Sequence, residues 1–266
     1  MERRKIGFII TAFDTKRELN FTVDMLRNKW KRTKDSPISI VISGDPERSV
    51  RFPNDPITRV TTLDNMVKDD FNGLVSTSIM KQMRHGMIEL QDLERHQGKQ
   101  VDYIVHMHGD ILLMSEDGFF AELEKFIASA KVIAGDTVGP QVTDYIHFEG
   151  LEIMPQLFVV DRNFIGLTGF MLNMYVVGDL EKRSTEWAIR GNLIRNYNST
   201  AHSCSSDKEV IEKLLHNVAP SRSQWELHSH WGGWCHFGNS LHFSQEVREA
   251  RNKAALQAHG VDLSSW

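Results

Sequence analysis

Three side chains that can bind a cation follow one another closely near the middle of the chain. His106, His108 and Asp110 end the segment Val101–Asp110, whose first part is an apolar, β-branched run. Imidazole nitrogens and carboxylate oxygens are both ligands of divalent metal ions in proteins. An ordinary structural role also fits, in which Asp110 begins a turn and the two histidines are polar residues of a strand. Which role applies depends on where the strand before Asp110 lies.

The segments around this cluster alternate between short apolar runs and stretches of helical periodicity, which are typical of buried strands and amphipathic helices. Strands are predicted at 6–11, 37–43, 58–63, 103–105, 131–134 and 153–164. Helices are predicted at 17–30, 70–94, 119–130, 181–195, 207–215 and 245–258. This order predicts an α/β fold with a mostly parallel central sheet flanked by helices, and 58–63 as an edge strand. Asp110 would then face the crevice at the carboxyl end of a central strand, where ligands bind.

The composition is that of an ordinary globular protein without a strong charge of either sign. The 266 residues are 41% hydrophobic and 25% charged, and the net charge is −4, so no global basic field attracts nucleic acid or membranes. Two cysteines outside any CxxC pair favour a reducing compartment. We expect a cytoplasmic protein without a signal peptide, and no apolar run approaches the length of about 20 residues that a membrane span needs.

A local cluster of basic residues follows the first predicted helix and is the exception to this charge balance. It consists of Lys29, Lys31, Arg32 and Lys34. One interpretation is a solvated helix end, where cations interact favourably with the helix dipole. The other is a patch that faces phosphate groups.

Four segments resemble, in type and order, the glycosyltransferases of the GT-A fold, in particular the family-2-like enzymes that use nucleotide sugars. They are Ile9–Asp14, Val41–Asp45, Val101–Asp110 and Ser115–Phe120. In that family the first two strands end near the nucleotide, a later strand leads to a metal-binding Asp-x-Asp motif, and a helix follows. The resemblance covers the element order from about residue 5 to residue 200 and is specific only at the strand ends.

The chain departs from the family at the metal motif, where it has His-Gly-Asp instead of Asp-x-Asp. Asp110 matches the carboxylate that contacts the cation in the family, and His108 replaces the other carboxylate. Imidazole is a weaker ligand than carboxylate for Mg²⁺ but is acceptable for Mn²⁺. The resemblance implies a divalent cation, Mn²⁺ or Mg²⁺, whose ligands are Asp110, His108 and His236.

The resemblance also implies which residues hold the nucleotide-sugar donor. The donor-binding residues would be Thr11, Ala12, Phe13, Asp14, Asp45 and His108. Residues 1–110 would form a nucleotide-binding half and residues 111–266 an acceptor-binding half of one compact domain. A His- and Trp-rich C-terminal segment would close the site.

Transfer with inversion needs a carboxylate that accepts the proton of the acceptor hydroxyl. Glu186 matches the family's acidic residue at the start of a helix, and Ser184 and Thr185 can cap that helix. Asp179 is the second candidate, because it follows Gly178 in a predicted turn. An ordinary role for Glu186 is a helix-start charge that the dipole favours.

The segment Trp225–Phe243 is aromatic, rich in His and broken by Gly, and predicts an ordered loop or a short hairpin. Several GT-A enzymes place a C-terminal histidine on the cation or the diphosphate, so His230 or His236 would complete the site with Asp110. The alternatives are a packed polar core and a zinc site, although only Cys235 lies near and the spacing fits no common zinc pattern.

The function that the resemblance implies is transfer of a sugar from a nucleoside-diphosphate sugar to a hydroxyl acceptor, assisted by metal. The acceptor would be a saccharide, a small molecule or, as in phage-type enzymes, hydroxymethylated bases of DNA. A nucleotidyltransferase is disfavoured because the stretch from Thr11 to Thr15 contains no glycine. A non-catalytic α/β nucleotide-binding module is a further alternative, and His108 in place of a carboxylate supports it.

Overall fold

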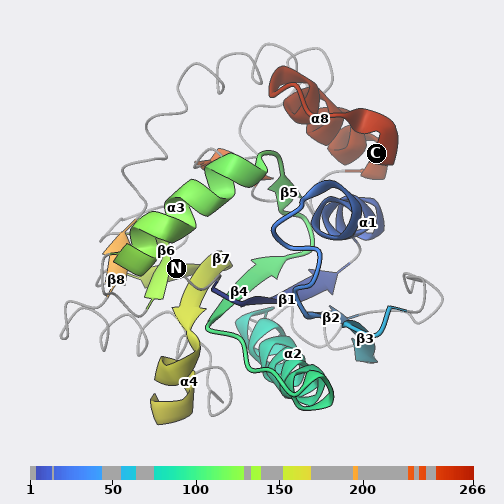
Figure 1. Cartoon of the computed structure of the whole chain (residues 1–266). Helices are drawn as coiled ribbons and strands as arrows, with labels where there is room; N and C mark the ends of the chain where they lie inside the picture. Colours follow the sequence, from blue (N-terminus) through green and yellow to red (C-terminus); the bar gives the residue numbers. More distant parts are fainter. Residues whose placement is uncertain are drawn as a thin grey trace.

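A seven-stranded sheet forms the centre of the molecule (Figure 1). The computed structural model of the chain describes residues 4–13, 15–43, 55–63, 75–128, 133–138, 152–168, 194–196, 227–230, 234–237 and 244–266. The strands of this sheet lie in the order β3-β2-β1-β4-β7-β6-β8. They are β1 Ile6–Phe13, β2 Ile38–Ser43, β3 Thr58–Leu63, β4 Tyr103–His108, β6 Ile133–Val138, β7 Glu152–Asp161 and β8 Ile194–Asn196.

The sheet is mostly parallel, as the sequence predicts. Strands β3, β2, β1 and β4 pair in parallel, while β7 is antiparallel to β4 and to β6, and β8 is parallel to β6. All strands except β7 therefore run in one direction. The chain proceeds from β1 to β2 and β3 on one side, and β4 lies on the other side of β1. The point where the strand order reverses is therefore between β1 and β4.

Helices cover both faces of the sheet, which confirms the predicted α/β architecture (Figure 1). The described helices are α1 Lys16–Asp24 with its π-helical continuation η1 Met25–Lys29, α2 Val75–Gln97, α3 Glu116–Ala128, α4 Arg162–Thr168, α8 Gln245–Ala258 and the 3-10 turn η7 Leu263–Ser265. The Ser115 hydroxyl caps the start of α3, because it accepts a hydrogen bond of 3.1 Å from the Gly118 amide. The predicted helix at 207–215 lies outside the described residues.

The two faces of the sheet differ in what covers them. Strand alternation places Phe8, Ile10 and Met107 in one hydrophobic core with residues of α1, α3 and α8. The opposite face is covered by α2, which contacts β1, β2 and β3. A Cβ atom added to Gly86 of α2 would lie only 2.4 Å from Ile9 Cγ2, so glycine at this position allows the helix to pack closely on the sheet.

The end of β7 corrects one prediction, because Arg162–Phe164 is helical rather than part of a strand ending at Phe164. The Asp161 carboxylate accepts a hydrogen bond of 2.7 Å from the Asn163 amide and a longer one from Phe164. This is helix capping, and it starts α4. A second correction concerns the predicted helix 181–195, whose last two residues, Ile194 and Arg195, belong to β8.

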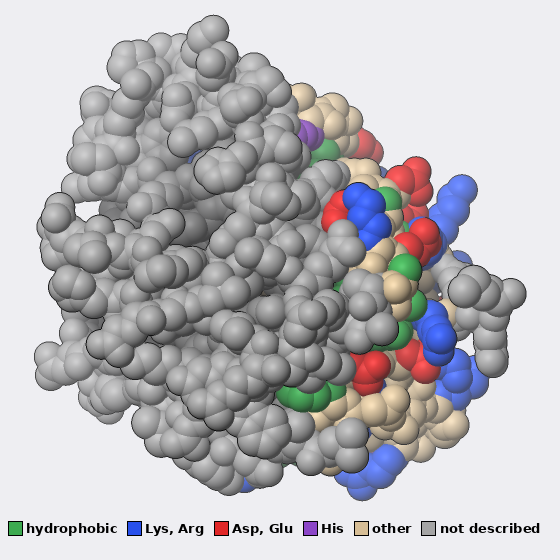
Figure 2. Space-filling view, turned by 90° about the vertical axis from the view of Figure 1, so that its left-hand side faces the viewer, with side chains coloured by type: hydrophobic (Ala, Val, Ile, Leu, Met, Phe, Trp, Pro, Cys, Tyr) green, Lys and Arg blue, Asp and Glu red, His purple; other side chains and the backbone are tan. Residues whose placement is uncertain are grey.

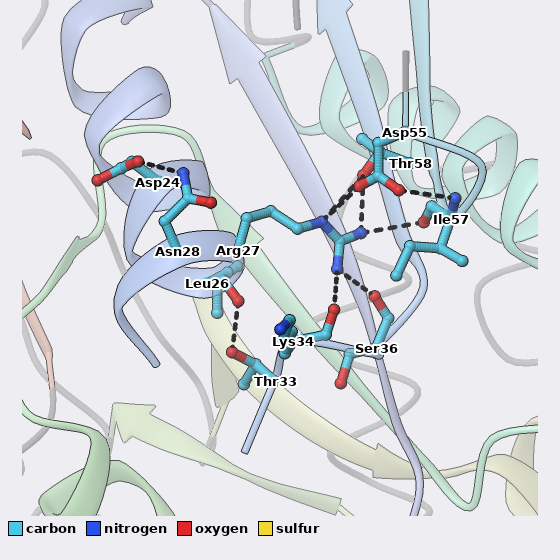
Figure 3. Close-up of polar contacts among 10 residues, drawn as sticks. All are labelled: Asp24, Leu26, Arg27, Asn28, Thr33, Lys34, Ser36, Asp55, Ile57 and Thr58. Carbon is cyan, nitrogen blue, oxygen red and sulfur yellow. Dashed lines mark hydrogen bonds and ion pairs between the residues drawn. The ribbon is translucent and has the colours of Figure 1, made fainter. Parts of the chain in front are cut away.

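The predicted edge strand β3 is confirmed, and Arg27 ties it to the first helical layer (Figure 3). The Arg27 guanidinium pairs with Asp55 at 2.8 Å and donates to the Thr58 hydroxyl at 2.7 Å. It also donates to the Ser36 carbonyl at 2.6 Å. Burial lowers the pKa of Arg27, and the charge of Asp55 opposes this shift. The largely buried side chain of Arg27 thus holds together the residues that lead into β2 and β3.

A second, three-stranded sheet has the order β5-β10-β9, with β5 Leu112–Leu113, β9 Leu227–His230 and β10 Trp234–Phe237. β9 and β10 pair antiparallel, so of the two predicted alternatives, a loop or a hairpin, the structure has the hairpin. β10 pairs antiparallel with β5, so Trp234 lies opposite Leu113 and Cys235 lies opposite Leu112. The C-terminal hairpin therefore lies beside the residues that follow Asp110.

The C-terminal helix α8 packs on α1 (Figure 1). The Asn252 amide donates to Glu18 at 2.9 Å, and the exposed pair Arg17–Glu249 lies beside it. At the other end, Lys29 pairs with Asp262 at 3.3 Å. Because the start of α1 contacts α8 and the end of η1 contacts the residues after α8, the two helices run in the same direction. No helix within the described ranges has the length and apolar composition that a membrane crossing needs.

Candidate functional site

The carboxyl ends of β1, β2 and β4 lie side by side at the reversal of the strand order. Thr11 of β1 lies opposite His108 of β4, and Phe13 lies opposite Ser43 of β2. The amide of Gly109 donates a hydrogen bond of 2.7 Å to the Thr11 carbonyl and extends the β1–β4 pairing past the end of β4. In open α/β sheets, ligands bind in the crevice outside such strand ends.

Gly109 allows the turn after β4 to lie against the start of α1. A Cβ atom at this position would be 2.6 Å from Ala12 Cβ and 2.7 Å from Thr15 Oγ1. Both distances are shorter than van der Waals contact, so only glycine fits without a shift of its neighbours. The close approach brings His108 and Asp110 to the level of Thr15, the residue that precedes α1.

His106 is a buried link beneath the candidate site. Its Nε2 lies 3.1 Å from the Thr11 hydroxyl, and its ring stacks on Phe158 with the ring centres 4.9 Å apart. The His108 ring meets the His106 ring edge to face at 5.7 Å. The exposed surface of His106 is 0%. His106 therefore helps to position the side chains of Thr11 and His108 from within the sheet and is not itself accessible to a ligand.

On the other side of the strand ends, Glu18 joins Asp110 to the C-terminal helix. Glu18 lies in the first turn of α1 and is only 4% exposed. Burial raises the pKa of the Glu18 carboxyl above its ordinary value, and the negative charge of Asp110 adds to the rise. The positive charges of Arg248 and Arg251 on α8 oppose it. Asp110 therefore lies near a buried cluster of charged residues that α8 supplies.

Of the three predicted metal ligands, His108 and Asp110 are described with their side chains, and His236 is described only by its place in β10. His108 and Asp110 offer an imidazole and a carboxylate, which suits Mn²⁺. The pairing of β10 with β5 ends at Cys235 and Leu112, and His236 is the next residue along β10. Among the residues described with their side chains, no three His, Cys, Asp or Glu groups come together. The metal set His108, Asp110 and His236 stays a prediction.

The structure places the predicted donor residues only in part. Thr11 and Ala12 are buried at the end of β1, while Phe13 and His108 are partly exposed. Four predicted residues lie outside the described parts of the chain: Asp14, Asp45, Asp179 and Glu186. Their roles in donor binding and proton transfer therefore stay predictions.

Sequence reasoning missed a set of residues that line the contact between α1 and α8: Thr15, Glu18, Arg248, Arg251 and Asn252. The residues of α8 recur at helical spacing with Ala255 and Leu256, so they share the helix face that is buried. The signal was present in the sequence as a helical stripe. It was overlooked because charged residues are normally placed on the solvent side.

The basic cluster after η1 makes contacts that fit a helix end. Lys29 pairs with Asp262, and Arg32 pairs with Glu124 of α3 and lies 3.9 Å from the centre of the Phe120 ring. On the described part of the face in Figure 2, basic and acidic side chains are interspersed. These contacts do not favour the interpretation of the cluster as a phosphate-facing patch.

Solved structures with a similar arrangement share little sequence with this chain. A 4-diphosphocytidyl-2C-methyl-D-erythritol synthase from Anaerococcus prevotii is 13% identical, with a TM-score of 0.44, over 73% of this chain and 87% of that one. A mannosyltransferase from Pyrobaculum calidifontis, solved with GDP-mannose and Mn²⁺, is 10% identical, with a TM-score of 0.43, over 98% of this chain and 74% of that one. No family model and no curated protein sequence matches this chain.

Proposed function

We propose that the chain is a glycosyltransferase that moves a sugar from a nucleoside-diphosphate sugar to a hydroxyl acceptor. The observation that carries this proposal is the register of β1 and β4, which puts Thr11 opposite His108 at the reversal of the strand order. The crevice at such a reversal is where open α/β sheets bind nucleotides. The predicted nucleotide segment and the His-Gly-Asp motif thus meet at one point, as the resemblance to GT-A enzymes requires.

The donor would lie along the ends of β1 and β2, held by Thr11, Ala12, Phe13, Asp14, Asp45 and His108. A divalent cation would be held by Asp110, His108 and His236. When bound, such a cation would neutralise the charge that grows on the leaving diphosphate. Asp110 fits this role because it lies two residues after the end of the largely buried strand β4 and is partly exposed.

The proton of the acceptor hydroxyl would pass to Glu186, with Asp179 as the second candidate. Removing a general base typically lowers the rate by roughly 10²–10⁴-fold. Glu186→Gln should therefore reduce kcat by about that factor and leave donor affinity almost unchanged, and Asp179→Asn is its matched comparison. If the sugar is transferred with retention, no such base is needed, so the stereochemistry of the product is determined first.

The proposal is tested by a panel of sugar nucleotides, measured by thermal unfolding with and without Mn²⁺. A donor should raise the melting temperature, because a ligand that binds only the folded state stabilises it. The same donor should be hydrolysed slowly without acceptor. The variant Asp110→Asn should lose turnover with nearly unchanged melting temperature of the free protein. Binding of no sugar nucleotide, or full turnover by Asp110→Asn, would contradict the proposal.

A further inference from the structure

The buried face of α8 carries two arginines, which is unusual for a helix that packs on a hydrophobic core. Arg248 is 6% exposed and Arg251 is 3% exposed. They share this face with Ala255 and Leu256, which belong to the core. Removing a guanidinium from water costs several kcal/mol unless anionic or polar groups surround it. The charges of both arginines act on the buried carboxyl of Glu18, so both guanidinium groups lie near the first turn of α1.

The packing of α8 on α1 places Arg248 near the start of α1. The two helices run in the same direction, and Asn252 contacts Glu18 at 2.9 Å. Arg248 lies one helical turn before Asn252, and Thr15 lies about one turn before Glu18. One turn from the Glu18–Asn252 contact toward the N-terminus of each helix, Arg248 of α8 and Thr15 before α1 therefore lie at about the same height along the two helix axes. The N-terminal ends of both helices, which carry partial positive charge, point to this side.

Thr15 provides a second, independent observation at this level. It is the residue before α1, but its side chain does not cap the helix. Its hydroxyl is buried and has no hydrogen-bond partner among the residues that the structure describes, and Thr15 is 6% exposed. A buried hydroxyl without a partner is costly, so its presence at a helix start calls for an acceptor that binds there. The hydroxyl lies against Gly109, directly beside the strand ends of the candidate site.

We propose that Thr15 at the start of α1 and the arginines Arg248 and Arg251 of α8 form an anion site that binds the phosphate groups of a nucleotide. Arginine forks match phosphate oxygens, and the amides of a helix start add to the attraction. This identity of the ligand rests on the proposed function, whereas the anion site itself rests on the α1–α8 packing. The C-terminal helix would thus contribute directly to the crevice formed by the first and fourth strands.

Two carboxylates near this position would repel a bound anion. Removing one of them should therefore strengthen anion binding instead of weakening it. Glu18 contacts α8 through Asn252, and Asp110 lies close enough to influence Glu18. Glu18→Gln removes one of these negative charges, and the glutamine carbonyl can still accept the hydrogen bond from Asn252. This variant should therefore bind an anion more tightly than the unchanged protein. A merely structural role for the cluster predicts no such gain.

The test is the binding of inorganic pyrophosphate to the full chain, measured by calorimetry with and without Mn²⁺. Arg248→Gln and Arg251→Gln should each weaken binding by roughly 10- to 100-fold, as expected for the loss of a hydrogen bond to a charged group. Arg248→Lys should retain part of the affinity, because it keeps the charge but not the fork. Arg95→Gln is the matched control, because Arg95 is an exposed arginine on α2.

Each result decides for or against the anion site. Tighter binding by Glu18→Gln together with weaker binding by the arginine variants supports it, and Glu18→Gln alone decides if an arginine variant does not fold. Absence of pyrophosphate binding, or equal affinity of Glu18→Gln and the unchanged protein, overturns it. Pyrophosphate binding in a protein that binds no sugar nucleotide would keep the anion site and reject only the proposed glycosyltransferase activity.

Discussion

At the scale of single residues, the space around Gly109 sets the geometry of the strand ends. A methyl group there would meet Ala12 and Thr15 at less than 3 Å. The backbone of Ala12 is only 3.2 Å from the added atom, so a rotated side chain cannot relieve the whole contact. We expect Gly109→Ala to destabilise the protein by about 1–3 kcal/mol, as overpacking of a core does. The free energy of unfolding in urea measures the effect.

Gly166 is the matched control for this substitution. It is an exposed residue of α4, and an added Cβ meets nothing within 4 Å. Gly166→Ala should leave stability unchanged or raise it slightly, because alanine is the better helix former. Equal stability of the Gly109→Ala and Gly166→Ala variants would show that the turn after β4 can move away from α1.

Glu18 gives the molecule a pH dependence with a defined sign. Burial raises its pKa above the ordinary value of 4.5, Asp110 adds to the rise, and Arg248 and Arg251 reduce it. A carboxyl with a raised pKa contributes stability that is complete below the unfolded pKa and is lost as pH rises through the folded pKa. Relative to Glu18→Gln, the unchanged protein should therefore become less stable as the pH is raised from the ordinary carboxyl pKa of 4.5 toward neutral. Urea unfolding of both proteins across this range measures the difference.

The control for Glu18 is Glu246→Gln, which changes an exposed carboxylate in the first turn of α8. Its stability difference from the unchanged protein should vary less with pH than that of Glu18→Gln. A stability of the unchanged protein that rises relative to Glu18→Gln over the same range would mean that Arg248 and Arg251 outweigh burial at this carboxyl.

At the scale of elements, a buried ion pair fixes the point where β7 becomes α4. Arg162 Nη2 lies 3.1 Å from Glu94 Oε2, and the Val101 amide donates to the same carboxylate at 3.0 Å. Arg162→Met would leave the Glu94 charge buried without its cation. Breaking a buried pair in this way typically costs about 3–5 kcal/mol. We expect a loss of this size, measured as the free energy of unfolding.

The comparison is the pair Arg95–Asp92, which lies on α2, the helix that carries Glu94. Its arginine side chain is 75% exposed, and surface pairs of this kind contribute about 0–1 kcal/mol. Arg95→Met should therefore have little effect on stability. A loss for Arg162→Met no larger than that for Arg95→Met would contradict a structural role for the buried pair.

The elements also show why sequence patterns predicted some parts of the fold and missed others. The apolar runs at β1 and β2 were predicted as strands because they are short, rich in β-branched residues and bounded by turn residues, which together favour a buried strand. The boundary at Arg162 was missed because the capping carboxylate of Asp161 acts on the backbone and leaves no trace in the apolar pattern. The charged face of α8 was missed because a helical stripe does not reveal which side the rest of the chain covers.

At the scale of the whole molecule, the candidate site combines segments from the two ends of the sequence. The strands β1, β2 and β4 and the residues that follow them were predictable, because each strand corresponds to a local run of residues, whereas their order in the sheet is seen only in the structure. The contact of Glu18 with Asn252 spans 234 positions, and no local pattern encodes such a distance. The register of β10 against β5 is of the same kind, because it pairs segments that lie far apart in the sequence.

This arrangement predicts that ligand binding stabilises both the end of β4 and the C-terminal helix α8. The sugar nucleotide with the largest melting shift in the panel should slow amide hydrogen exchange at the end of β4 and throughout α8. The reason is that phosphate groups held by Arg248 and Thr15 would stabilise the docking of α8 on α1. The reference is the last turn of α2. Leu90 of α2 lies against Gly7 near the start of β1, so the residues after Leu90 lie toward the amino-terminal ends of the strands, away from the candidate site. Slower exchange at β4 alone would place the ligand in the strand crevice without α8. Equal slowing at the end of α2 would indicate a general stabilisation of the fold instead of contact with the C-terminal helix.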